Sequence, residues 1–154
     1  MSTKQSNPKD AVGVGKIPMS CVPSLPMQEV GVAMYEGARK YGRHNWRASG
    51  TRASVYYDAA MRHLMAWWEG ENLDPDSGLP HITKAMATLL VLRDAQMFGG
   101  QTDQETYIDD RPPKHSPGHT KALNLKAQRL LRFYPDAPDP ITELGQEAEK
   151  PEGD

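Results

Sequence analysis

The chain has 154 residues, which predicts a single domain, and its mean hydropathy of −0.68 indicates a modest hydrophobic core. A net charge of −2 provides no field that would attract nucleic acid or an anionic membrane. The single cysteine excludes an intramolecular disulfide and a cysteine-based zinc cluster. No apolar run approaches the roughly 20 residues that span a bilayer. We therefore expect a cytoplasmic protein without membrane or nucleic-acid partners.

The N-terminal part combines a polar segment with a proline-rich one. Residues 1–15 are polar and contain glycine, so we expect them to be flexible. Three prolines in residues 16–26 favour an extended segment on the core, with Cys21 buried among apolar neighbours. Apolar residues then recur at helical spacing, which predicts a helix over 27–41 that ends at Gly42.

A second helix is predicted over 54–69, with Ser54 as its N-cap and Gly70 as its terminator. This helix is apolar on nearly all sides, which is typical of the central helix of a bundle. We expect His63 to be a hydrogen-bonded histidine of the core. One narrow strip, which faces either solvent or a polar site, carries the remaining side chains Asp58, Arg62, Met65 and Glu69.

A third helix is predicted over 80–98, with Pro80 in its first turn and two glycines after its end. The short loop between the second and third helices predicts an antiparallel hairpin at the centre of the domain core, residues 27–98. The fold class expected is therefore all-α: a helical bundle with a central hairpin and extended terminal segments.

The composition changes after the third helix. Residues 101–119 have the composition of a loop, and apolar spacing predicts a short amphipathic helix over 120–133. We expect this C-terminal arm and helix, residues 101–135, to complete a domain that spans 16–135. The acid- and proline-rich tail, residues 136–154, is predicted to be disordered.

The sequence WWEGENLDPDSGLPH, which joins the hairpin helices, has three interpretations. An EF-hand loop beginning at Asn72 would place Ser77 where glycine is required and Thr83 where glutamate is required, which argues against calcium. Asp-Pro-Asp-Ser-Gly has a composition typical of a plain turn, a role that we expect for Asp76. The third interpretation is half of a magnesium or manganese site.

The metal interpretation depends on which side chains the hairpin brings together. Glu69 ends the polar strip of one helix, and Glu71 and Asp74 follow at ExxD spacing. His81 opens the next helix, so an antiparallel hairpin places it near these acids. Mg²⁺ is commonly held by carboxylates together with phosphate oxygens of a substrate. Lys84 and the helix N-terminus would add positive potential for a phosphate.

Three blocks of the sequence, residues 36–47, 56–95 and 109–114, resemble the phage and bacterial dATP/dGTP diphosphohydrolase family. That family is related to MazG-type, all-α nucleoside triphosphate pyrophosphohydrolases, and the resemblance covers about residues 16–135. It implies an oligomeric enzyme that uses Mg²⁺ or Mn²⁺ to cleave purine dNTPs to dNMP and pyrophosphate. The apolar central helix of a small hairpin also favours partners, so we expect a dimer or tetramer. In phages with modified purines, the implied role is to supply dGMP. The EExxE motif of the wider MazG pattern is absent.

With the resemblance, the candidate metal ligands are Glu36, Asp58, Glu69, Glu71, Asp74 and His81. Glu71 and Asp74 are also predicted to be catalytic, with a carboxylate serving as base. The candidate substrate-binding residues are Lys40, Arg43, Asn45, Trp46, Arg47, Arg62 and Lys84. Cations can hold triphosphate oxygens, Trp46 can stack on a base, and Asn45 can pair with a purine edge.

Structural roles remain open for several of these residues. Glu36 with Lys40, and Asp58 with Arg62, could be plain ion pairs along one helix. Trp46 could equally be a core residue.

Two further functions remain open. One is a broad house-cleaning NTP pyrophosphatase, and the other is a non-catalytic module that binds a protein through Trp67 and Trp68 or through the tail. No histidine is followed by aspartate, which excludes the His-Asp type of phosphohydrolase. Asp109, Asp110 and Arg111 suggest only an arm that reaches a neighbouring subunit.

Overall fold

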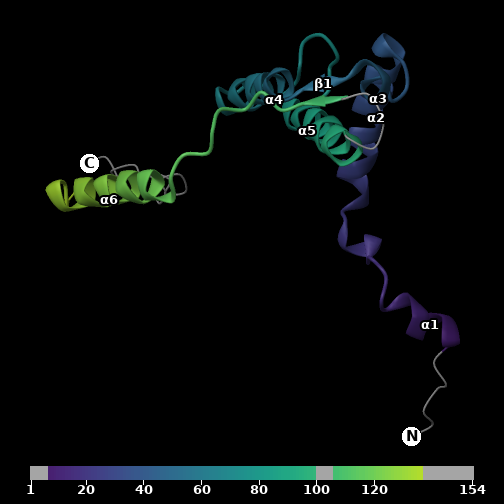
Figure 1. Cartoon of the computed structure of the whole chain (residues 1–154), viewed down its shortest axis with the longest axis horizontal. Helices are drawn as coiled ribbons and strands as arrows, with labels where there is room; N and C mark the ends of the chain where they lie inside the picture. Colours follow the sequence, from purple (N-terminus) through teal and green to yellow (C-terminus); the bar gives the residue numbers. More distant parts are fainter. Residues whose placement is uncertain (1–6, 100–105, 137–154) are drawn as a thin grey trace, which may run out of the picture. The chain divides into compact units, whose positions relative to one another are not determined.

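The computed structural model describes residues 7–99 and 106–136. Helices dominate this part of the chain, which confirms the all-α prediction, and the described residues contain one pair of two-residue strands. The chain divides after Arg111 into two compact units, and each is described by itself. The elements are α1 (Pro8–Gly13), the 3₁₀ helix η1 (Met19–Cys21), α2 (Ser24–Tyr41), α3 (Trp46–Ser49), β1 (Thr51–Arg52), α4 (Ala53–Trp68), α5 (His81–Phe98), β2 (Tyr107–Ile108) and α6 (Pro117–Phe133) (Figure 1).

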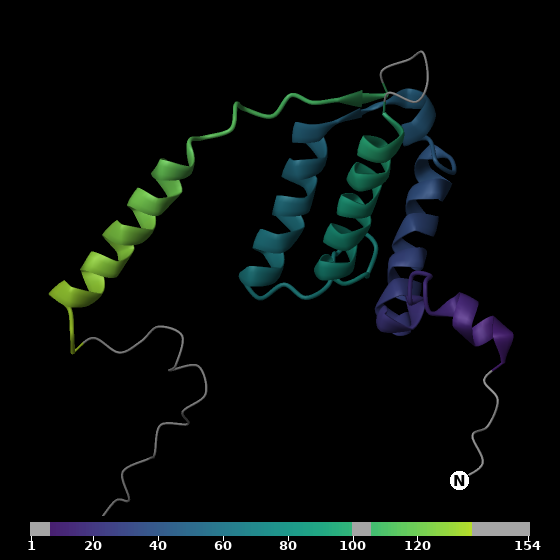
Figure 2. The same ribbon diagram turned by 60° about the horizontal axis from the view of Figure 1, so that its bottom comes forward.

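Helix α5 is the middle helix of the first unit. Figure 2 shows it between α4 on one side and α2 on the other, and it contacts both. Because two helices cover α5, its buried side chains are distributed around it and are mostly small; they are His81, Thr83, Ala85, Ala87 and Ala95. Small residues allow neighbouring helices to approach closely. The core of this unit is correspondingly modest and centres on Val30, Ala33 and Ala87.

The prediction that the helix over 54–69 is the central one is wrong within this chain. The buried residues of α4 are the small Ala53 and Ala60, which fit the contact between α4 and α5. Its large apolar residues project outward instead: the exposed fraction is 60% for Tyr57 and 79% for Trp68. The periodicity of apolar residues correctly predicted an apolar helix, but it does not indicate which neighbouring element covers each side of that helix.

Several local predictions also need correction. Helix α2 begins at Ser24, so Pro26 lies in its first turn, where a missing N–H breaks no helical hydrogen bond. Cys21 is exposed and not buried. Ser54 is not the N-cap, because α4 already begins at Ala53.

The C-terminal predictions are partly met. Helix α6 begins at Pro117, three residues before the predicted start, and ends at Phe133 as expected. Residues 42–52, which separate the first two predicted helices, contain the short elements α3 and β1, and the predicted loop 101–119 contains β2. Of the predicted tail, all but Asp136 lies outside the described residues.

The parallel pair β1–β2 fixes the start of α4. Thr51 pairs with Tyr107 in this ladder. The chain then continues to Asp110, whose carboxylate accepts hydrogen bonds from the Ser54 N–H (2.8 Å) and hydroxyl (2.5 Å). Asp110 therefore satisfies a backbone N–H that has no partner within the first turn of the helix. This gives a structural role to an acid for which the sequence suggested only contact with another subunit.

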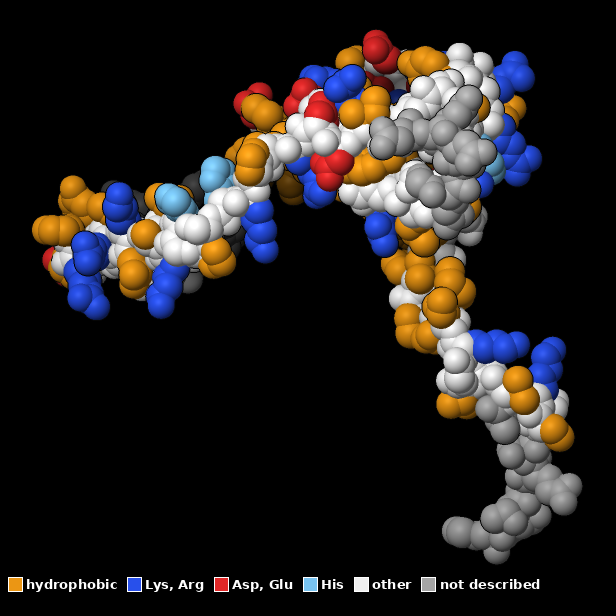
Figure 3. Space-filling view, viewed as in Figure 1, with side chains coloured by type: hydrophobic (Ala, Val, Ile, Leu, Met, Phe, Trp, Pro, Cys, Tyr) orange, Lys and Arg blue, Asp and Glu red, His pale blue; other side chains and the backbone are white. Residues whose placement is uncertain are grey.

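Helix α6 belongs to the second unit, and its described residues are all exposed. Figure 3 shows both hydrophobic and Lys/Arg side chains around it. The polar and apolar residues of α6 are spaced so that one face of the helix is apolar. On that face, Leu123, Leu130 and Phe133 are exposed. None of the described helices has the length and hydropathy needed to cross a membrane.

We predict that Asp110→Ala lowers the midpoint of thermal unfolding by several degrees, because the first turn of α4 loses its acceptor. The matched control is Asp109→Ala, which removes exposed contacts with Arg111 two residues away, an ion pair and a hydrogen bond from its backbone N–H, and should have little effect. Differential scanning calorimetry of both variants measures the difference. Equal midpoints for the two variants would contradict this role of Asp110.

Candidate functional site

The loop between α4 and α5 is a tight turn that directs Asp74 inward. The Asp74 N–H donates to the Leu79 carbonyl (2.8 Å), and the Gly78 N–H donates to the Asp74 carbonyl (2.7 Å). Gly78 has a φ of 69°, which glycine adopts without strain. The Ser77 hydroxyl donates to the Asp74 carboxylate at 2.6 Å. The turn interpretation is thus confirmed, and the turn also orients a carboxylate.

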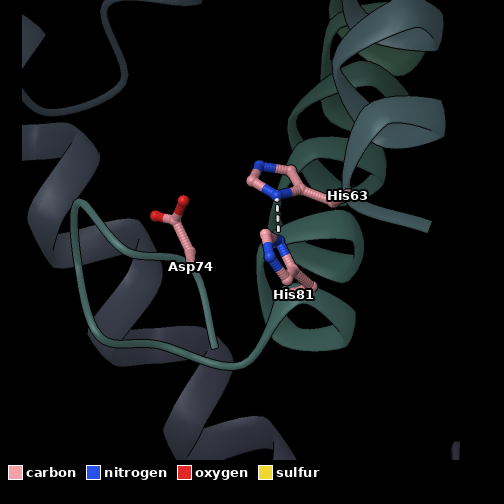
Figure 4. A group of neighbouring side chains, drawn as sticks. All are labelled: His63, Asp74 and His81. Atoms are coloured by element: carbon pink, nitrogen blue, oxygen red, sulfur yellow. Dashed lines mark hydrogen bonds between the residues drawn. The ribbon is translucent and has the colours of Figure 1, made fainter. Parts of the chain in front are cut away.

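Asp74 faces two histidines across the hairpin, as Figure 4 shows. His63 comes from α4 and His81 from the first turn of α5, and their Nδ1 atoms lie 2.9 Å apart. One ligand atom from each of the three side chains lies within 4.8 Å of the others. This is the arrangement of neighbouring donors that a single metal ion requires. The buried histidine, His81, is only 4% exposed.

His81 also approaches Glu71. The Glu71 Oε2 atom lies 3.3 Å from His81 Nε2, within ion-pair distance. That contact lacks hydrogen-bonding geometry, so the buried Nε2 atom has no hydrogen-bond partner among the described residues. A buried nitrogen without a hydrogen bond is destabilising, and a bound ion or substrate group would satisfy it.

The protonation states fit a cation. Hydrogen bonding from Ser77, followed by the nearby positive charge of Lys84, lowers the pKa of Asp74 despite the opposing effect of burial. Burial, the largest cause, lowers the pKa of His63, which keeps its imidazole neutral at pH 7. A neutral imidazole and an ionised carboxylate are the forms that bind metals. Two imidazoles with one carboxylate suit Mn²⁺ better than Mg²⁺, which prefers oxygen ligands.

Lys84 connects this group to α2. Its Nζ atom lies 2.6 Å from the Glu36 carboxylate and 3.8 Å from Asp74. Glu36 also accepts a hydrogen bond from Lys40, one turn further along α2. The hydrogen bond from Lys40, followed by that from Lys84, lowers the pKa of Glu36. Two lysines and two carboxylates therefore alternate beside the histidine pair.

A cavity of about 430 Å³ opens beside these residues, between α2, α4 and α5. This volume is within the range of pockets that bind small molecules. Polar and charged side chains contribute to it from all three helices. Its lining residues include Glu36, Lys40, Tyr41, Asn45, Trp46, Tyr56, His63, Lys84, Thr88 and Val91.

At the Trp46 side of the cavity, Asp94 of α5 holds α3 in place. The Trp46 indole N–H donates to Asp94 at 2.6 Å. The Arg47 guanidinium donates two hydrogen bonds to the same carboxylate, at 2.7 and 2.8 Å, and lies 3.9 Å from the centre of the Phe98 ring. These bonds, with those from Arg47 making the largest contribution, lower the pKa of Asp94 to about 2.

The predicted site residues thus fall into three groups. The cavity or the cluster beside it includes Glu36, Lys40, Asn45, Trp46, Glu71, Asp74, His81 and Lys84. Arg47 is paired with Asp94 instead. The remaining candidates have exposed side chains without an ion pair to any described residue; they are Arg43, Asp58, Arg62 and Glu69.

Sequence reasoning missed two functional candidates. His63 was expected to be a core histidine, yet it is half-buried, lines the cavity and contacts His81. The available signal was its position: His63 and His81 lie nine residues to either side of position 72, so an antiparallel hairpin can bring them together. Asp94 offered no comparable signal, because its partners are 47 and 48 residues away in the sequence.

Comparison with known proteins matches the chain to a protein family and to a phage protein. Residues 6–105 match a family described as "dATP/dGTP diphosphohydrolase, N-terminal". A dATP/dGTP diphosphohydrolase of Salmonella phage PMBT28 is 31% identical over 78 residues, which are 51% of this chain. The matched segment spans 26% of that phage protein's length, so the chain corresponds to only part of it. No solved structure matches the chain.

We predict that His63→Gln and Asp74→Asn each weaken Mn²⁺ binding by roughly tenfold or more, because each removes one donor from the cluster. The matched control is Asp76→Asn, which changes an exposed acid of the same loop outside the cluster. Isothermal titration of the folded variants with MnCl₂ measures the affinities. A loss for Asp76→Asn equal to that for Asp74→Asn would refute the assignment.

A second prediction concerns acid stability. The folded-state pKa of Asp94 is about 2, below its ordinary value of 3.8. A depressed pKa stabilises the folded state above the unfolded pKa, and the effect is lost as the pH falls through the folded pKa. The free energy of unfolding of the wild type should therefore exceed that of Asp94→Asn at pH 7, and the difference should shrink from about pH 4 towards pH 2. Urea unfolding at several pH values measures it; a pH-independent difference would contradict the ion pair's role.

Proposed function

The chain belongs to the dATP/dGTP diphosphohydrolase family, and on that premise we propose that it cleaves a purine deoxynucleoside triphosphate to the monophosphate and pyrophosphate. The observation that carries the proposal is the cluster of His63, Asp74 and His81 beside a cavity lined by Lys84. A neutral imidazole and an ionised carboxylate are suited to bind a metal ion, and a lysine is suited to bind phosphate oxygens. A plain interaction module would have no need of this combination.

Three side chains would hold a divalent ion: His63, Asp74 and His81. When bound, the ion would supply positive charge that stabilises the phosphate oxygens in the transition state. The family resemblance implies Mg²⁺ or Mn²⁺, and of these two ions Mn²⁺ accepts the two nitrogen donors more readily. Glu71 is close enough to His81, at 3.3 Å, to orient its ring or to contribute a further oxygen.

The reaction requires a water molecule, a base and a bound triphosphate. Water attacks the α-phosphorus, the bond from that atom to the bridging oxygen breaks, and pyrophosphate leaves with the bond's electron pair. We assign the proton of the attacking water to Glu71, because its carboxylate is 53% exposed and can reach water. Lys84 and Lys40 bind phosphate oxygens, while Glu36 holds both ammonium groups at the cavity wall.

Other cations are less suited to the phosphates. Arg47 already donates its hydrogen bonds to Asp94, so we assign it a structural role.

For a phage-encoded chain, the reaction would take place in the host cytoplasm and, with dGTP as substrate, would supply dGMP for modified-purine synthesis.

We also propose that the chain forms a homo-oligomer, a dimer or tetramer, through the outer face of α4. Tyr57, Met65 and Trp68 are each more than half exposed on that one helix. Exposed apolar side chains gathered on one helix are typical of protein interfaces. A second copy would cover side chains that this chain leaves in water.

We predict that the protein with Mn²⁺ converts dGTP or dATP to the monophosphate and pyrophosphate, and that Glu71→Gln lowers kcat/KM by roughly 10²–10⁴-fold. Asp74→Asn should abolish turnover, whereas Asp76→Asn should retain it. Anion-exchange chromatography resolves the nucleotide products. Release of orthophosphate without monophosphate, or no turnover of any purine dNTP, would reject the proposed function.

Substitution of Trp68 tests the oligomer. Trp68→Glu should lower the molar mass measured by light scattering, because a charge cannot be buried in an apolar interface. Phe133→Glu is a matched control, since Phe133 is 77% exposed but lies on α6. A wild type that is already monomeric would refute the proposed interface.

A further inference from the structure

We propose that the nucleotide lies along α5 in one direction, with its triphosphate at Lys84 and its purine at Trp46, and that Asp94 is the residue that positions Trp46 for the base. This inference rests on the proposed function, and it adds the orientation of the substrate and a residue that contacts no part of it.

The cavity has chemically different ends. Along α5 its lining residues are Lys84, Ala87, Thr88 and Val91, which recur at helical spacing and so form one continuous strip. Lys84 lies beside Asp74 and Glu36 at the start of this strip. Asp94, which holds Trp46, follows ten residues later, about 15 Å along a helix. A nucleotide carries its base and its terminal phosphate at opposite ends, so the cavity favours one direction.

Aromatic and amide groups gather at the end away from Lys84. Trp46 contributes to the cavity together with Tyr41 at the end of α2 and Tyr56 in α4. Aromatic faces stack on nucleobases of any kind. Asn45 also lines the cavity, and within the described residues its side-chain amide has no hydrogen-bond partner. An amide offers both a donor and an acceptor, which the edge of a purine can pair with.

Asp94 holds this end in place from behind. Its carboxylate accepts the Trp46 indole N–H at 2.6 Å, and two bonds from Arg47 fix the carboxylate in turn. Asp94 does not line the cavity, so it acts through Trp46 and not on the nucleotide. An indole whose N–H is fixed cannot rotate freely, so the Trp46 side chain loses less conformational entropy when a base stacks on it.

The test compares two competing ligands of the 154-residue chain. The kinetics of conversion to monophosphate and pyrophosphate with Mn²⁺ give the KM for dGTP and dATP. Inorganic tripolyphosphate, which has no base, serves as a competitive inhibitor, and its inhibition constant is Ki. Asp94→Ala should raise the KM by about tenfold and leave the Ki unchanged. Asp94→Asn retains an acceptor for the indole N–H and should give an intermediate KM. Lys84→Met is the matched control and should raise both constants.

Each outcome decides the matter. If Asp94→Ala raises KM and Ki together, the carboxylate serves only to keep the domain folded, and the orientation is refuted. If neither constant changes, Trp46 does not hold the base in the way proposed. If the wild type turns over no purine dNTP, both the proposed function and the orientation are rejected. If the wild type turns over a purine dNTP, a contrary result for the variants refutes the orientation alone.

Discussion

The structure around the cavity depends on the ammonium group of Lys84. It lies 2.6 Å from Glu36 on α2 and 3.8 Å from Asp74 in the α4–α5 loop, while its own backbone belongs to α5. One cation therefore connects three parts of the chain. Both carboxylates are mostly shielded from water, so without Lys84 they would be two partly buried like charges. The same arrangement that stabilises the helices thus maintains a concentration of charge suited to phosphate and metal.

Small side chains on α5 make this arrangement possible. Ala85, Ala87 and Ala95 allow α2 and α4 to pack on either side of α5, which leaves little volume for a conventional core. The larger apolar residues of α4 then face outward, where a second copy of the chain is proposed to cover them. A domain that places a polar cavity at its helix junction has less apolar surface to bury within one chain, and oligomerisation would compensate for it.

The sequence predicted the hairpin well, because its signals are local. Pro80, Gly78 and the Asp-Pro-Asp-Ser-Gly turn specify where α5 begins and how the chain reverses, and Asp74 and His81 sit next to them. His63 was assigned to the core because a histidine among alanines and tryptophans has no local sign of function. Its partner lies 18 residues away, and only the packing of α4 on α5 brings the Nδ1 atoms of the two rings to 2.9 Å.

The sequence by itself determined the long helices α2, α4, α5 and α6 and the turn between α4 and α5, since these follow from residues that are adjacent or at fixed helical spacing. It also determined the family, through resemblance over long segments. Tertiary structure decided which helix is central, that His63 joins Asp74 and His81, and that Asp94 binds Trp46 and Arg47. These contacts join residues 7 to 48 positions apart through side-chain volume and charge. Periodicity shows which face of a helix is apolar, but the partner of that face depends on how the whole chain packs.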